Sequence, residues 1–82
     1  MDTAQKLKTL MIAELGLDEA FSNAGSTTAL LGHMPELDSM AVVTILNAIE
    51  LEFDVVIADD DITAEIFETL GSLTTFVDQL AA

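Results

Sequence analysis

The chain has 82 residues, of which 51% are hydrophobic and only four are aromatic, so one small and mostly aliphatic core is expected. It has no cysteine, which excludes disulfides, thiolate metal sites and a cysteine nucleophile. Fifteen acidic residues against two lysines give a formal net charge of -13, which disfavours nucleic acid and anionic lipid as partners and favours basic protein surfaces.

Residues 1–82 are expected to form a single cytoplasmic domain, with a monomer as the default. No basic segment followed by an apolar run opens the sequence, so no signal peptide is expected. The longest strongly apolar stretch, residues 40–49, is too short to span a bilayer, so no membrane insertion is expected. Considered alone, the acidity is equally well explained by a need for solubility.

The first predicted helix runs from about residue 4 to residue 15. Its apolar residues have the spacing of one helical face, and they are Leu7, Leu10, Met11 and Leu15. Gly16 follows as a typical C-terminal stop. Residues 16–38 then mix turn-forming and apolar residues and predict a long loop, anchored to the core by Phe21, Leu30, Leu31 and Met34.

The second helix is predicted from Asp38-Ser39 to about Phe53. One face, about 100° wide, is apolar and is expected to enter the core; it consists of Val42, Ile45, Leu46, Ile49 and Phe53. The opposite face carries Met40, Thr44, Asn47 and Leu51, with Val43 at its edge and Ala41 and Ala48 beside it. Such an apolar exterior is unusual in so acidic a chain and predicts a docking surface. The expected partner-binding residues are Met40, Ala41, Val43, Thr44, Asn47 and Glu50.

Residues 54–61 are expected to connect this helix to a short helix at about residues 63–67, with a brief extended stretch at residues 55–57. The last helix is predicted to start after Gly71, with Ser72 as its N-cap. Its core stripe is Leu73, Phe76, Val77 and Leu80. The predicted fold is therefore all-α: a bundle of three longer helices and one short helix, with a long loop after the first helix.

Ser39 stands at the predicted start of the second helix, where a serine is most often an N-cap. A catalytic serine needs a base and an oxyanion hole, but the only histidine is His33 and no Gly-x-Ser-x-Gly motif surrounds Ser39. We therefore expect no enzyme activity. A serine that another enzyme modifies needs only exposure and a recognisable flank, and Ser39 is expected to have both.

No metal site is expected. Asp59, Asp60 and Asp61 lack the pattern of an EF-hand calcium loop and are interpreted as a solvated acidic turn. His33 has no second histidine or cysteine with which to complete a metal site, and it is interpreted as a loop residue.

Residues 36–40, Glu-Leu-Asp-Ser-Met, resemble the Asp-Ser-Leu attachment motif of acyl carrier proteins, with Met40 in the leucine position. The triplet alone is a weak signal, but here it lies at mid-chain in an acidic, cysteine-free pattern of four helices. The resemblance covers nearly the whole chain and continues through residues 15–17, 30–32, 49–53, 61–67 and 70–73. Within the family, residues 30–32, 35–43 and 59–61 are similar to stand-alone carriers found with exosortase and exopolysaccharide systems of Gram-negative bacteria.

The resemblance implies a covalent cofactor. A phosphopantetheinyl transferase would use coenzyme A and magnesium to attach 4'-phosphopantetheine to the Ser39 oxygen, and Asp38 is the residue that the transferase would read. The thiol of this arm would carry an acyl group as a thioester, loaded and removed by ligases, synthases and acyl-transfer enzymes with basic docking surfaces. Asp38 also has a simpler interpretation, since an acidic group at a helix N-terminus contributes about 0.3–1 kcal/mol of stability.

The sequence departs from many carriers of fatty acid synthesis, which place carboxylates on the outer face of the second helix just after the serine. Here those positions hold Ala41 and Thr44, and acidity resumes only at Glu50 and Glu52. We therefore expect a specialised pathway and docking that depends only weakly on salt. Two alternatives remain open: a carrier of aminoacyl or peptidyl groups, and an acidic helical interaction module without a covalent arm.

Overall fold

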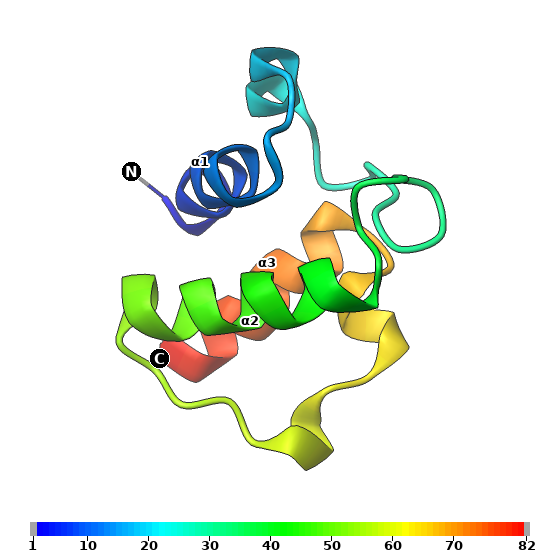
Figure 1. Ribbon diagram of the computed structural model, residues 1–82. Helices are drawn as coiled ribbons and strands as arrows, with labels where there is room; N and C mark the ends of the chain where they lie inside the picture. Colours follow the sequence, from blue (N-terminus) through cyan, green and yellow to red (C-terminus); the bar gives the residue numbers. More distant parts are fainter. Residues whose placement is uncertain (1, 82) are drawn as a thin grey trace.

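The computed structural model describes residues 2–81. It contains three α-helices: α1 (Thr3–Leu15), α2 (Ser39–Phe53) and α3 (Leu70–Ala81). Three short 3-10 helices lie between them (Figure 1): η1 (Glu19–Asn23), η2 (Asp59–Asp61) and η3 (Ala64–Phe67). Residues 2–81 contain no strand, only an isolated bridge between Ala29 and Thr69, so the all-α prediction is confirmed, with η3 as the short fourth helix. No helix within the same residues has the length and apolar character that a transbilayer span requires.

Local signals in the sequence set the bounds of α1 and α2. Asp2 and Asp38 are the N-caps, and each carboxylate accepts the backbone N–H three residues later at 2.8 Å. Gly16 is the C-cap of α1, as predicted, with the φ of 65° that favours glycine. Asp54 is the C-cap of α2 and takes a similar left-handed conformation at φ 55°. Aspartate is one of the few other residues that adopt this conformation at modest cost.

α3 begins earlier than predicted, and Ser72 is not its N-cap. The first helical residue is Leu70, directly after Thr69. The Ser72 N–H donates to the Thr69 hydroxyl and the Thr69 N–H donates to the Ser72 hydroxyl, both at 3.1 Å. This reciprocal pair is a capping box in which serine takes the place usual for glutamate. Because Thr69 satisfies the N–H of Ser72, the first turn already includes Gly71 and Ser72.

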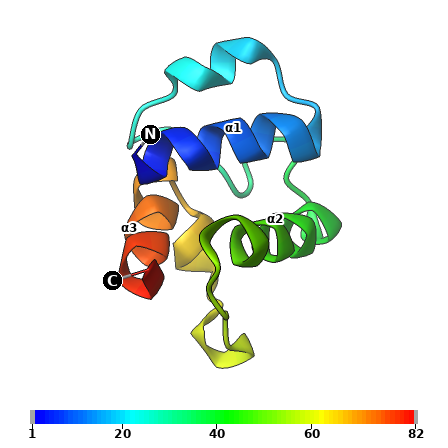
Figure 2. The same cartoon turned by 90° about the vertical axis from the view of Figure 1, so that its left-hand side faces the viewer.

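The core combines one face of each long helix with residues from the connecting segments, and α1 packs against both α2 and α3 (Figure 2). Its buried members are Leu7, Leu10, Met11, Leu30, Leu37, Ala41, Ile45, Leu46, Ile49, Ile57, Phe67, Leu70, Leu73 and Val77. Fully burying one large aliphatic side chain stabilises a fold by about 1.5–3 kcal/mol. The three predicted helix faces are therefore confirmed in their centres, and the half-buried edges are Leu15, Val42, Phe53, Phe76 and Leu80.

The long segment between α1 and α2 is more ordered than predicted. It contains η1, and residues 26–31 run beside residues 67–71 at the start of α3. Four backbone N–H groups bridge these two segments at 2.8–3.0 Å, from Leu30 to Glu68, Leu31 to Phe67, Leu70 to Thr28 and Gly71 to Ser26. Of the predicted anchors, Leu30 is buried, and Phe21 and Met34 are half-buried. Leu31 is exposed, so its side chain is not the predicted anchor, and its backbone N–H makes the contact with Phe67.

Two further contacts fix this segment. Gly71 approaches Ser26 so closely that a Cβ atom at position 71 would lie 2.8 Å from the Ser26 carbonyl oxygen. Lys8 of α1 is buried although it is charged, and its Nζ donates to the Ala24 carbonyl at 3.1 Å. A buried ammonium needs such a partner, so this bond is part of the fold. The segment that leads into α2 is therefore held from both α1 and α3.

Candidate functional site

Ser39 is the first residue of α2, and its side chain is exposed. The helix is capped by Asp38, whose carboxylate accepts the Ala41 N–H at 2.8 Å. The interpretation of Ser39 as the N-cap is therefore wrong, and its hydroxyl is not needed to hold the start of the helix. An exposed hydroxyl without a capping role is open to a modifying enzyme.

The residues next to Ser39 hold it in place. Leu37 is buried in the core, and its N–H donates to the Met34 carbonyl at 3.0 Å. The Asp38 carbonyl accepts the first helical hydrogen bond, from the Val42 N–H at 2.9 Å. Asp38 also lies where the helix dipole favours negative charge. A buried residue on one side and a capped helix on the other thus fix the exposed pair Asp38-Ser39.

The outer face of α2 is exposed and carries no charge. Met40 is 75% exposed, Val43 56% and Leu51 85%. Thr44 and Asn47 lie between them on the same face and are exposed as well. Much of the apolar surface of this acidic chain is therefore gathered on the helix that begins with Ser39.

Ala41 does not belong to this face, which corrects the sequence prediction. It is only 7% exposed and packs in the core. The physical reason is its register, since Ala41 lies one turn before Ile45 and shares the inward side of α2 with it. Burial therefore removes Ala41 from the residues that a partner can contact.

Among residues 2–81, the other polar groups singled out in the sequence form no hydrogen bond with Ser39. His33 is an exposed loop residue, and Asp59, Asp60 and Asp61 form the exposed helix η2. Within residues 2–81, no three His, Cys, Asp or Glu side chains come together in a way that could hold a metal ion. What the site offers is an accessible hydroxyl beside a carboxylate.

A match among solved structures decides the family. The solution NMR structure of a holo acyl carrier protein from Nitrosomonas europaea matches with a TM-score of 0.87 and 42% sequence identity, over 96% of this chain and 95% of that chain. This chain belongs to the acyl carrier protein family. A comparison with protein-family models gives no match. Acyl carrier proteins are carriers rather than enzymes, so the prediction of a protein without enzyme activity is confirmed.

Glu50 of this carrier makes a contact that the sequence did not indicate. Its half-buried carboxylate accepts the Ile57 N–H at 2.9 Å, and its carbonyl accepts the Val55 N–H at 3.2 Å. Because Ile57 is buried, these bonds hold the connection after α2 against the helix. Glu50 was expected on the partner-binding face, but its carboxylate binds the Ile57 backbone and only part of the side chain is accessible to a partner.

A cavity of about 170 Å³ lies between α2 of the carrier and residues 57–62. It begins at Val43, one helical turn beyond Ser39. Its lining is mixed, with apolar walls from Val43, Leu46, Ile57 and Ile62 and polar groups from Asn47, Glu50 and Asp59. The hydrogen bond from Ile57 to Glu50 joins the two walls of this cavity.

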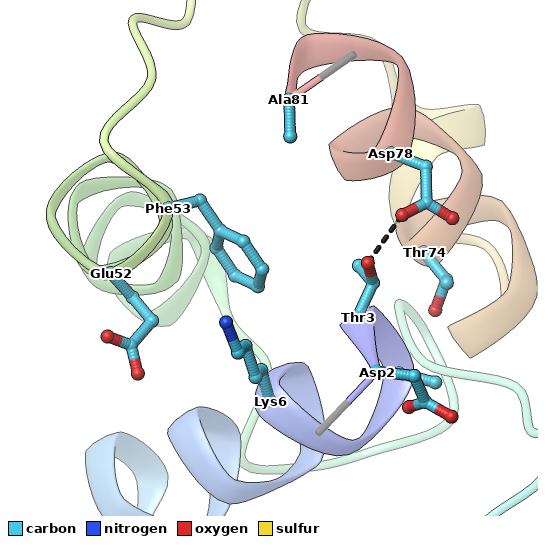
Figure 3. Close-up of a pocket in the computed structure, with 9 residues that line it drawn as sticks. Asp2, Thr3, Lys6, Glu52, Phe53, Thr74, Asp78 and Ala81 are labelled. Atoms are coloured by element: carbon cyan, nitrogen blue, oxygen red, sulfur yellow. Dashed lines mark hydrogen bonds between the residues drawn. The ribbon is translucent and has the colours of Figure 1, made fainter.

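A larger cavity of the carrier, about 680 Å³, lies at the opposite end of α2 from Ser39 (Figure 3). Here the start of α1 meets the ends of α2 and α3. The Lys6 side chain points toward Phe53, with its Nζ 5.8 Å from the ring centroid, and the Thr3 hydroxyl donates to Asp78. These contacts join three helices, so we assign them a structural role.

Proposed function

We propose that Ser39 carries a 4'-phosphopantetheine arm and that this arm holds an acyl group as a thioester. The observation that carries the proposal is the exposed Ser39 hydroxyl at the start of α2. Asp38 caps the helix, so the Ser39 hydroxyl is not needed as the cap. Two further facts support it. The matching structure from Nitrosomonas europaea is a holo form, and the chain has no cysteine, so the thiol for a thioester has to come from the arm.

A phosphopantetheinyl transferase is the first partner that this function requires. With coenzyme A and magnesium, it would join the phosphate of the arm to the Ser39 oxygen. We expect the transferase to recognise the Asp38 carboxylate. Oδ1 of Asp38 caps the helix and the side chain is exposed, so the same carboxylate can also face an arginine or a metal ion of the transferase.

Intact-mass measurement tests this function. After incubation with coenzyme A, magnesium and a broad-specificity transferase, we expect wild type to gain one phosphopantetheine and Ser39→Ala to gain none. Asp38→Asn keeps a good N-cap but removes the charge, so it should be modified more slowly while its stability falls by no more than about 1 kcal/mol. No addition to wild type, under conditions that modify a control carrier, would instead favour an acidic interaction module without an arm.

For the cargo, we propose an acyl group in a specialised pathway, such as the exosortase and exopolysaccharide systems whose carriers this sequence resembles. The uncharged outer face of α2 supports this choice over fatty acid synthesis. The cavity that begins at Val43 can receive the first atoms of a cargo on the arm. Loading the modified protein with acyl ligases and, in parallel, with aminoacyl ligases separates this function from that of an aminoacyl or peptidyl carrier.

The partner-binding surface that we propose consists of Met40, Val43, Thr44 and Asn47. Since none of these residues is charged, we expect transferase affinity to fall only slightly between low and high salt. Thr44→Glu places a carboxylate on the same exposed face and should make the salt dependence steeper. A steep loss of affinity already in wild type would contradict docking through an apolar surface.

A further inference from the structure

A groove of about 370 Å³ runs between α1 and α2. One wall consists of Thr9, Leu10, Ala13 and Glu14 from α1, and the other of Ala48, Leu51 and Glu52 from α2. It shares no residue with the cavity that begins at Val43. Nothing in the proposed carrier function uses this groove.

The centre of the groove is apolar, and small side chains line it on both sides. Leu10 is buried and forms part of the floor, while Ala13 and Ala48 are small. Small residues let the backbone of an approaching helix come close, and helix axes then pack about 8–10 Å apart. Leu51 stands at the rim and is 85% exposed. A helix lying in the groove would cover Leu51 and would remove its apolar surface from water.

The rim of the groove is acidic on both sides. Glu14 on α1 and Glu52 on α2 are both exposed. An occupant with lysine or arginine along its two flanks complements these carboxylates. A second copy of this chain would bring a net charge of -13 against the same charge, so it is a poor occupant. The same repulsion acts against nucleic acid and anionic lipid.

We propose that this groove binds one amphipathic helix of a partner protein, with small or apolar residues along its centre and basic residues on both flanks. The mode is that of a helix docked in a hydrophobic groove. Leu51 lies 12 residues after Ser39, which is about 18 Å along the helix axis. A partner that contacts only the groove residues leaves Ser39 open. The groove can therefore hold the carrier to one protein while other enzymes act near Ser39, and its binding does not require the arm.

The test uses a fluorescein-labelled synthetic helix of 14 residues, with alanine and leucine along one face and lysines on both flanks, titrated with the full chain. Leu51→Asp should weaken binding about tenfold. Val56→Asp is the matched control, because Val56 is also 85% exposed but does not line the groove. The control adds the same charge and should leave the affinity for the basic peptide equal or slightly higher.

A second matched pair tests the acidic rim. Glu14→Lys and Glu19→Lys change the net charge equally, and both glutamates are exposed, but only Glu14 lines the groove. We expect Glu14→Lys to weaken binding several-fold more than Glu19→Lys. Equal effects within either pair would mean that net charge alone drives binding and would overturn the proposal. Amide shifts on peptide addition should centre on the groove residues of α1 and α2, and shifts centred on Ser39 would overturn it as well.

Discussion

Residues 17–38, which lead into Ser39, are fixed to the start of α3 by the four backbone bonds between residues 26–31 and residues 67–71. Residues 54–63, which leave the other end of α2, return to that helix through Glu50, whose carbonyl and carboxylate accept the N–H groups of Val55 and Ile57. Figure 1 shows this second segment swinging away from the three helices before it reaches η3. Four backbone bonds pair part of the first segment with residues 67–71, whereas two bonds to Glu50 and the packing of Val55, Ile57 and Ile62 hold the second segment.

The two segments that flank α2 therefore have different roles: one positions Ser39, and the other forms a wall of the cavity that begins at Val43. The position of Ser39 is set by a segment that cannot move without breaking a ladder of backbone bonds. The wall of the cavity that begins at Val43 is set by a segment whose opening breaks the hydrogen bond between Ile57 and Glu50 and exposes Ile57 and Ile62. Ser39 can thus keep its position when residues 57–62, which form one wall of the cavity, shift.

The largest expected effect is that of Gly71→Ala, which should disturb the pairing of residues 26–31 with residues 67–71. A Cβ atom at this position would lie 2.8 Å from the Ser26 carbonyl, so the ladder has to shift. We expect a loss of about 1–3 kcal/mol in the free energy of unfolding, measured in urea. This loss should appear although alanine is about 1 kcal/mol better than glycine inside a helix.

Gly25→Ala is the control for this substitution, because a Cβ atom at Gly25 would meet nothing within 4 Å. Its stability should stay within about 0.5 kcal/mol of wild type. Equal destabilisation by the two substitutions would show that the close approach of Gly71 to Ser26 does not fix the segment before α2.

A smaller effect is expected when the second segment is released by Glu50→Ala. Removing the acceptor of the Ile57 N–H should cost about 1 kcal/mol. Hydrogen exchange at the Ile57 amide should become faster, while exchange at the Leu30 and Leu31 amides should not change. Glu50→Gln keeps an acceptor oxygen and should lie between Glu50→Ala and wild type. Unchanged exchange at Ile57 in Glu50→Ala would mean that the segment is held by other contacts.

The helices could be predicted because their signals are local. The apolar spacing along α1 and α2, the stop at Gly16 and the start at Asp38-Ser39 depend only on neighbours in the sequence. The exposure of Ser39 followed from the same register. The site was therefore predictable as far as its position at a helix start.

What the sequence did not predict depends on contacts between distant segments. Ala41 lies at the border of two helix faces, and only its packing beside Ile45 assigns it to the core. The bond between Glu50 and Ile57 and the pairing of residues 26–31 with residues 67–71 need the folded chain. The capping pair of Thr69 and Ser72 was missed because Ser72, after a glycine, is itself a good N-cap by local rules.

The burial of Lys8 has a consequence for the stability of a thioester. An acyl thioester is an electrophile that amines and thiols attack, and this chain has no cysteine and only two lysines. Lys8 is buried with its ammonium on the Ala24 carbonyl, and Lys6 is held over Phe53, 14 residues or about 21 Å along α2 from Ser39. The thioester would lie at the tip of the proposed arm and not at Ser39 itself, so the distance along α2 does not protect it from Lys6. The burial of Lys8 is what removes one of the two lysine amines from attack.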